Sequence, residues 1–283
     1  LLNSKYGFPP PSFSGNDIVF QSKYTRLVFC RNSRKLLFND RLIWMNSSCS
    51  RSGNPPSVSS TDFDFILAPL LRPGDLKSTP AKPLVVLDPG HGGKDTGARK
   101  GSKLLEKDLV LDISQRIRKK LARQDVSVRL TRNRDSTLSL SRRPQLARKW
   151  KADLFVSIHI NSAGNPEARG IETYILPAPG FQSTSGKRSN TDPLPGNKHD
   201  RANSLAAYNL HDTLLESTKA EDRGIRHARF EVLKTAPCPA VLLECGFLSN
   251  RGEAKKLARS KYRNTIASAV ANGIIKYFKA GER

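Results

Sequence analysis

Val85-Val86-Leu87-Asp88-Pro89-Gly90-His91-Gly92-Gly93 is the stretch of this 283-residue chain that decides its fold. The apolar, β-branched start predicts a buried strand, and the Pro-Gly and Gly-Gly pairs predict a turn directly after it. His91 therefore follows the end of a strand, which is where open α/β sheets bind their ligands. A polar loop histidine without a function is the alternative, and the motifs elsewhere in the chain decide between the two.

The composition predicts a folded protein with its own core. Hydrophobic residues make up 37% of the chain, and no run of 18 apolar residues occurs. We therefore expect no transmembrane helix. Because the chain starts at Leu1 and its only methionine is Met45, we also expect that a leader has been removed.

The net charge of +23 favours an anionic partner. Residues 1–80 carry 10 Lys or Arg and 5 Asp or Glu, or +5, which leaves +18 on residues 81–283. A solvated basic surface and an anionic cell wall explain this charge equally well. We expect no nucleic-acid partner, because no zinc finger, helix-turn-helix or aromatic-interleaved basic stripe is present. The four cysteines form no CxxC pair and leave the redox compartment open.

The first 82 residues predict a small β module ahead of the main domain. Residues 1–16 are rich in Pro, Ser and Gly, and we expect them to be poorly ordered. A stalk-like β module is expected over 17–71 and a linker over 72–82. Its predicted strands lie at 18–20, 26–29, 35–38, 42–44 and 63–71, with a tight turn at Asn39-Asp40 and a loop over 46–61.

Residues 83–280 alternate between strand and helix patterns. The predicted strands are 85–88, 126–130, 154–160, 170–176 and 240–244, and the predicted helices are 109–121, 140–150, 201–217 and 262–278. Ser249-Asn250 can cap a further helix that follows the last strand. This alternation predicts an α/β fold with a mostly parallel, doubly wound sheet and helices on both faces.

Four polar side chains are predicted to meet at one edge of that sheet. His91, His159 and Glu244 each stand at the end of a strand, and Glu106 opens the first amphipathic helix. Strands of one sheet deliver their carboxyl ends to the same edge. Two histidines and one carboxylate form a known zinc set that leaves a position for water, and a further carboxylate can act as a base. The alternatives are a helix-start role for Glu106 and a hydrogen-bonded core histidine at position 159.

Four segments carry a family resemblance: LDPGHGG at 87–93, LEKD at 105–108, SIHINS at 157–162 and ECGFLSN at 244–250. In this order they resemble the zinc-dependent N-acetylmuramoyl-L-alanine amidases of the cell wall, amidase type 3, over roughly residues 82–280. The resemblance implies one Zn²⁺ held by His91, Glu106 and His159, with Glu244 as the catalytic base. It implies hydrolysis of the amide between N-acetylmuramic acid and L-alanine in peptidoglycan.

The resemblance also sets expectations about the setting in which the protein works. They are a location in the periplasm or cell envelope, peptidoglycan as the partner, and a monomer. Some amidases of this resemblance carry a long helical insertion whose glutamate occupies the zinc. Residues 177–199 stand there instead; they hold several prolines and glycines, no glutamate and a single acid, Asp192. We therefore expect a mobile loop and no activator protein.

Three other functions remain open at this point. They are a zinc carboxypeptidase-like peptidase, a wall-binding protein without activity, and nucleic-acid binding through charge alone. His199 and His211 are expected at the surface. His227, Arg142 and Arg143 are expected on solvated basic faces.

Overall fold

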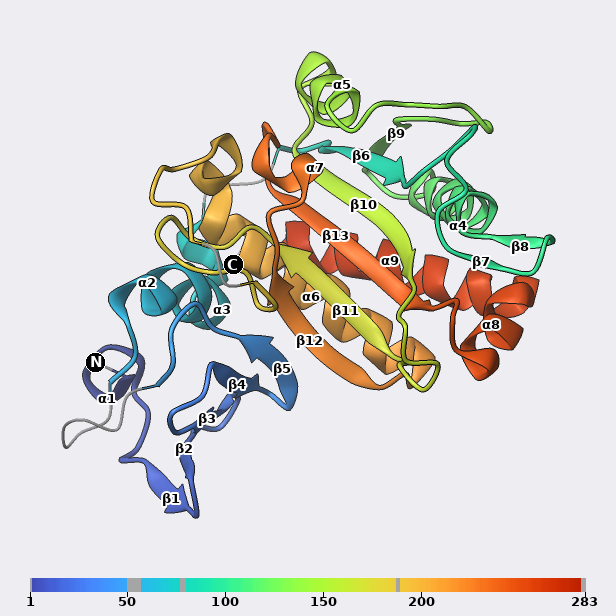
Figure 1. The fold of residues 1–283 in the computed structure, drawn as a ribbon. Helices are drawn as coiled ribbons and strands as arrows, with labels where there is room; N and C mark the ends of the chain where they lie inside the picture. The colour runs from blue at the N-terminus through green and yellow to red at the C-terminus, as the bar shows by residue number, and fades with distance from the viewer. Residues whose placement is uncertain (1, 50–56, 77–79, 187–188, 281–283) are drawn as a thin grey trace.

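The computed structural model describes residues 2–49, 57–76, 80–186 and 189–280 (Figure 1). Its main feature is an 11-stranded sheet in the order β1-β2-β3-β4-β5-β12-β11-β13-β10-β6-β9. Helices cover both faces of the part that contains β6 and β10–β13. The predicted α/β class is confirmed, with the small β module at one edge of the same sheet.

The N-terminal module is an antiparallel meander. Its strands are β1 (Ser12–Ser14), β2 (Asp17–Gln21), β3 (Arg26–Cys30), β4 (Lys35–Phe38) and β5 (Arg41–Trp44). The tight turn predicted at Asn39 and Asp40 is confirmed, because both residues have positive φ (48° and 63°) between paired strands. This geometry is that of the turns that best match the twist of a hairpin.

Two local predictions for the module are wrong. Residues 1–16 were expected to be poorly ordered, but the described part contains α1 (Leu2–Tyr6) and β1. The strand expected over 63–71 is helical, in α2 (Ser60–Asp62), a π-helix (Phe63–Leu67) and α3 (Ala68–Leu71). Ser59 accepts a hydrogen bond from the backbone of Asp62 and starts this helical run.

The predicted loop over 46–61 and the predicted linker over 72–82 are described only in part. Residues 50–56 of the loop and 77–79 of the linker lie outside the described residues. The rest of the linker holds a short 3₁₀ helix, Pro73–Asp75.

The main part of the sheet is mostly parallel, as predicted. Its strands are β6 (Leu84–Pro89), β9 (Ser127–Leu130), β10 (Leu154–Asn161), β11 (Ile171–Ile175), β12 (Asp222–His227) and β13 (Ala240–Phe247). Of their pairings only β11 with β13 is antiparallel. The short strands β7 (Arg99–Lys100) and β8 (Leu104–Leu105) pair separately.

Two helical layers enclose this part of the sheet. One core lies between the sheet and α4 (Glu106–Leu121), α6 (Asp200–Thr218) and α9 (Ser260–Ala280), with α8 (Arg251–Ala258) beside them. A second core on the other face packs Val86, Phe155 and Leu242 against α5 (Arg142–Trp150) and α7 (Glu231–Lys234). Asn250 caps α8 as predicted, since its side chain accepts hydrogen bonds from two backbone N–H groups of the helix. No described helix is long and apolar enough to cross a membrane.

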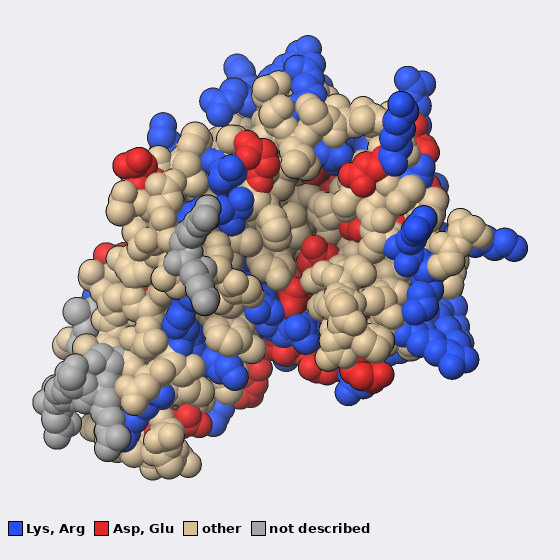
Figure 2. Space-filling model, in the orientation of Figure 1, with Lys and Arg blue, Asp and Glu red and all other residues tan. Residues whose placement is uncertain are grey.

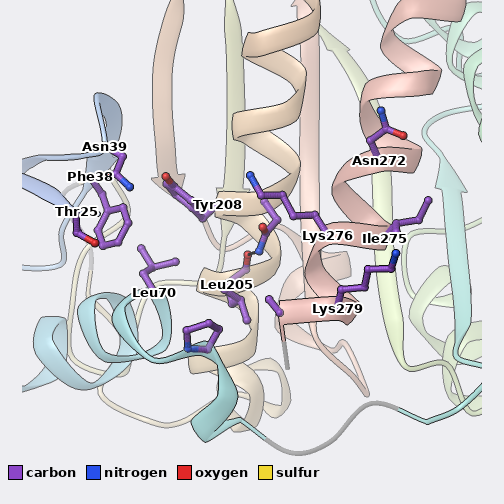
Figure 3. Close-up of a pocket in the computed structure, with 13 residues that line it drawn as sticks. Thr25, Phe38, Asn39, Leu70, Leu205, Tyr208, Asn272, Ile275, Lys276 and Lys279 are labelled. Carbon is purple, nitrogen blue, oxygen red and sulfur yellow. Dashed lines mark hydrogen bonds between the residues drawn. The ribbon is translucent and has the colours of Figure 1, made fainter. Parts of the chain in front are cut away.

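The module joins the main sheet through β12, a strand that the hydrophobic pattern did not predict. Only Ile43 and Ile225 are in register between β5 and β12, and side chains add to the junction. Asp222 accepts a hydrogen bond from Leu42 N at 2.9 Å. A cavity of about 680 Å³ lies where the module meets α6 and α9 (Figure 3), and the contacting rings of Phe38 and Tyr208 are part of its lining. Its described lining contains no His, Cys, Asp or Glu, so the predicted chemistry lies elsewhere.

Candidate metal centre

The structure brings His91, Glu106 and His159 together. One ligand atom from each lies within 4.8 Å of the other two. Glu106 Oε1 lies 3.2 Å from His91 Nε2 and 3.0 Å from His159 Nδ1. His91 follows β6, His159 stands near the end of β10 and Glu106 begins α4, so the predicted strand-end arrangement accounts for the cluster.

Two buried arginines hold the loop that presents His91. Arg132 donates to the carbonyls of Pro89 and Gly90 at 2.9 and 2.7 Å. Arg143 donates to the carbonyls of Pro89 and His91 at 2.8 and 2.9 Å. These bonds fix three successive carbonyls of a loop in which His91 itself has the left-handed φ of 58°. Such a conformation is uncommon for a residue other than Gly, and the surrounding contacts hold it.

A buried ion pair anchors Arg143. Its Nη1 lies 2.8 Å from Asp88 Oδ1, and both side chains are almost completely buried. Asp88 also accepts hydrogen bonds from Thr131 and Ser157, at 2.6 and 2.8 Å. The strand that carries the motif is therefore tied to two neighbouring strands by side chains as well as by its backbone.

Glycine is required where the backbone touches the ligand set. A Cβ at Gly90 would overlap the imidazole of His159, and a Cβ at Gly97 would overlap both His91 and Glu106. Gly97 also has a φ of +63°, which glycine adopts without strain. Close approach of backbone to side chain explains why glycines surround this histidine.

Further contacts orient the candidate ligands. His91 Nδ1 lies 2.8 Å from Asp95 Oδ2, so His91 presents Nε2 to the centre. Glu106 accepts from the backbone N–H of Ile160 at 3.0 Å and of Ala98 at 2.7 Å. Burial alone would raise the pKa of Glu106, but hydrogen bonds from His159 and His91 outweigh burial and hold that pKa well below its ordinary range. Glu106 is thus an ionised carboxylate, as a metal ligand must be.

The donor set fits a zinc ion. Zinc is bound by His nitrogen and carboxylate oxygen, and two His with one carboxylate leave a fourth position for water. Ligand atoms about 2.0–2.1 Å from one tetrahedral ion lie about 3.3 Å from each other. The separations of 3.2 and 3.0 Å from Glu106 Oε1 are close to this value.

Glu244 lies beside this cluster on the neighbouring strand. In the register of β10 and β13 it stands opposite His159, and in the register of β11 and β13 it stands opposite Glu172. Its Oε2 atom is buried and has no hydrogen-bond partner among the described residues. Burial, together with the charges of Glu106 and Glu172, raises the pKa of Glu244 well above its ordinary value. A raised pKa makes a carboxylate a stronger base.

The sequence reasoning missed a second cluster that adjoins Glu244. Glu172, which is 2% exposed, accepts hydrogen bonds from Arg223 Nε at 2.8 Å and Arg226 Nη1 at 2.6 Å on one oxygen. Its other oxygen accepts from Asn161 and Tyr174, both at 2.8 Å. A single acid inside a predicted strand does not indicate a site by itself. Arg223 and Arg226 are 51 and 54 residues from Glu172 in the sequence, so no local motif links them to it.

Three side chains expected at the surface are buried. His211 lies between Thr173 Oγ1 and Asp222 Oδ1, each 2.9 Å away. His227 is 2% exposed, and Arg143 holds the His91 loop. The partners of His211 and Arg143 are distant in the sequence, so no local pattern could show that these side chains are buried. His227 is buried although its Nδ1 has no hydrogen-bond partner among the described residues.

Segment 177–199 lies between the N-terminal module and β12. Arg34 of the module donates to the carbonyls of Gln182 and Ser183 at 3.4 and 3.5 Å, and Thr184 N donates to His227 O at 2.8 Å. Residues 187–188 lie outside the described part. Where it is described, the segment contributes no side chain to the metal cluster.

Known proteins resemble this chain mainly over its second part. The sequence profile of a family described as N-acetylmuramoyl-L-alanine amidase matches residues 85–276. The N-acetylmuramoyl-L-alanine amidase AmiA of Salmonella typhimurium is 36% identical over 228 residues, which are 71% of this chain and 78% of that protein. Among solved structures, the amidase AmiC2 of Nostoc punctiforme is 35% identical with a TM-score of 0.60, covering 72% of this chain and 99% of that one. The catalytic domain of CwlV from Bacillus (Paenibacillus) polymyxa is also 35% identical, with a TM-score of 0.59, covering 70% and 99%.

Proposed function

Because the chain belongs to the N-acetylmuramoyl-L-alanine amidase family, we propose that it hydrolyses the amide between N-acetylmuramic acid and L-alanine in peptidoglycan. The observation that carries the proposal is the cluster of His91, Glu106 and His159 at the sheet edge, with Glu244 on the adjacent strand. We assign the three clustered residues as ligands of one Zn²⁺ and Glu244 as the base. When bound, zinc would polarise the scissile carbonyl and acidify water.

The protein's own residues handle the proton and the geometry. Glu244 takes a proton from the water that attacks the carbonyl carbon, and gives it to the nitrogen as the carbon–nitrogen bond breaks. The products are the muramic acid carboxylate and a peptide with a free L-alanine amine. Asp95 orients His91, and the backbone N–H groups of Ile160 and Ala98 orient Glu106. Rigid placement is what makes such a site reactive.

A protein with this activity works on the cell wall, and we place it in the periplasm or cell envelope. We expect a monomer. We also expect that the enzyme needs no activator, because no acid of segment 177–199 lies among the described metal-centre residues. The charge of +23 suits an anionic wall better than a free solute. These points rest on the substrate assignment.

The test is hydrolysis of purified peptidoglycan before and after removal of metal. We expect release of muropeptides with new L-alanine amino termini, loss of that release with a chelator, and recovery with added Zn²⁺. Products cut within the peptide would instead favour a carboxypeptidase. Binding to the wall without any cleavage, in protein shown to hold zinc, would favour a wall-binding protein.

A further inference from the structure

Arg223 has hydrogen-bonding capacity that the fold does not use. Its Nε is bound to Glu172, but its two Nη groups have no partner among the described residues. The side chain is 30% exposed, whereas that of Arg226 is 15% exposed. Arg226 donates from both Nη groups, to Glu172 and to Ser185 at 3.1 Å. Of the two arginines, Arg223 is therefore the one able to bind a ligand.

The guanidinium of Arg223 is held before any ligand arrives. Its Cζ lies 5.0 Å from the ring centroid of Phe247, which is buried, and Glu172 fixes its Nε. A guanidinium presents its N–H groups as a planar fork that matches a carboxylate. A fork that is already oriented loses little freedom on binding.

The charges around Arg223 favour an anion. Glu172 pairs with two guanidinium groups, and each of its two carboxylate oxygens accepts two hydrogen bonds. Arg223, Arg226 and Glu172 together carry one positive charge, and Glu244 stands opposite Glu172 on the neighbouring strand. Figure 2 shows that this face is hollowed near its middle, with acidic side chains on the floor and basic side chains along the border toward β12.

The position of Arg223 suits a group a few residues from the scissile bond. The sheet order is β12-β11-β13-β10, and neighbouring strands lie about 4.8 Å apart, so β12 lies about 14 Å from β10. The contact with Phe247 of β13 brings the side chain of Arg223 back toward the metal centre. An extended peptide spans about 3.3–3.6 Å per residue, so a carboxylate two to four residues along the peptide lies within reach.

We propose that Arg223 binds the α-carboxylate of the acidic second residue of the stem peptide, and so makes the enzyme discriminate between free and amidated stems. This rests on the proposed amidase function. In peptidoglycan that residue is a D-glutamate linked through its side chain, and its α-carboxyl group is either free or amidated. An amide offers one oxygen and no charge to the fork, so it binds the guanidinium less well.

The experiment compares two soluble substrates, N-acetylmuramoyl-L-alanyl-D-glutamate peptides with the second residue as the free acid or as its α-amide. For the parent protein we expect kcat/KM to be roughly tenfold to a hundredfold higher on the acid, the usual range for one charge-assisted pair. Arg223→Gln should remove this preference by raising KM on the acid, with kcat little changed. Arg223→Lys keeps the charge without the fork and should restore part of it.

Controls separate a binding role from a structural one. Arg169→Gln removes an exposed arginine that pairs with Glu221 and should leave the acid preference intact. In the inactive Glu244→Gln background, calorimetry should show weaker binding of the acid peptide after Arg223→Gln, with unchanged zinc content.

The two proposals fail in different ways. An equal fall in kcat on acid and amide after Arg223→Gln, or a parent protein indifferent to amidation, would overturn the role of Arg223. A zinc-loaded parent protein that releases L-alanine amines from neither peptide nor from whole peptidoglycan would overturn the amidase function itself.

Discussion

The metal-centre end of the sheet and its N-terminal edge are built in opposite ways. At the centre, β6 is paired along its length with β10 and β9, and a buried ion pair and buried arginines hold the His91 loop. At the edge, β5 meets β12 at one registered pair, and the ion pair of Arg41 with Asp212 is partly exposed. The difference indicates that the centre has polar supports of its own, whereas the module is joined to the main part by one registered strand pair and by a shared hydrophobic core.

The largest expected effect is on turnover, without a change in metal binding. Glu244→Gln keeps the shape of the side chain but cannot accept a proton, so turnover should fall at least about a hundredfold. Bound zinc, measured by elemental analysis, should stay at the level of the parent protein. Glu167→Gln, which changes an exposed acid in the loop after β10, is the matched control. Loss of zinc together with activity would instead make Glu244 a ligand.

A pair of substitutions compares the two ion pairs directly. Asp88→Asn leaves Arg143 charged and buried without its partner, which typically costs about 3–5 kcal/mol. Arg41→Met removes a partly exposed pair and should cost less than about 1 kcal/mol, since Lys276 still pairs with Asp212. Urea unfolding measures both. Equal losses at the two sites would remove the contrast between centre and edge.

The sequence predicted the parts of the centre that depend on local signals. His91 follows an apolar, β-branched run that ends in Pro-Gly, His159 lies near the end of a second such run, and Glu106 opens a helix with a clear apolar face. The strand β12 was missed because Asp222–His227 has one strongly apolar residue. Its charges are satisfied by Glu172 and His211, and such pairings over tens of residues leave no trace in hydrophobic periodicity.

The helical run at Phe63–Leu71 shows a different limit. A short apolar segment fits a buried strand and a buried helix equally well. The spacing of Ser59 and Asp62 at the start of the run is a helix-capping signal, and it outweighs the apolar pattern.

Removing the module tests whether it is only attached. A chain that begins at Lys82 should fold, bind zinc and cleave small soluble muramyl-peptides, because all four predicted site residues and the family match lie after that point. Its melting temperature should be lower, because Ile225 loses its strand partner Ile43 and Arg226 loses its contact with the ring of Trp44. A soluble, zinc-loaded product without activity on these peptides would show that the module forms part of the catalytic fold.

A pH-dependent effect is expected in the acid range, where β12 carries a buried histidine. Burial, with the charges of Arg34 and Arg229, lowers the pKa of His227 to about 3. The unfolded chain therefore binds a proton below about pH 6.5 that the folded chain does not. Stability should fall from pH 6.5 toward pH 3 by up to about 1.4 kcal/mol per pH unit from this residue, and not change through it above pH 7.

His227→Leu is the variant that isolates this contribution. It should flatten the acid side of the stability curve, measured by urea unfolding at fixed pH values, and leave the difference between pH 7 and pH 8 unaltered. An unchanged acid slope would show that His227 takes up its proton in the folded state.

The smallest effect concerns segment 177–199, which contacts the module and β12. An inhibitory insertion would need an acid on the metal, and no described residue of this segment is among the clustered ligands. Its described contacts run to Arg34 of the module, to the backbone of His227 and, through Ser185, to Arg226. Replacing residues 180–194 by a short Gly-Ser bridge should therefore leave turnover of a small muramyl-peptide at or below that of the parent protein. A severalfold rise in turnover at equal zinc content would mean that the segment restrains the site, and the enzyme would then need something to move it.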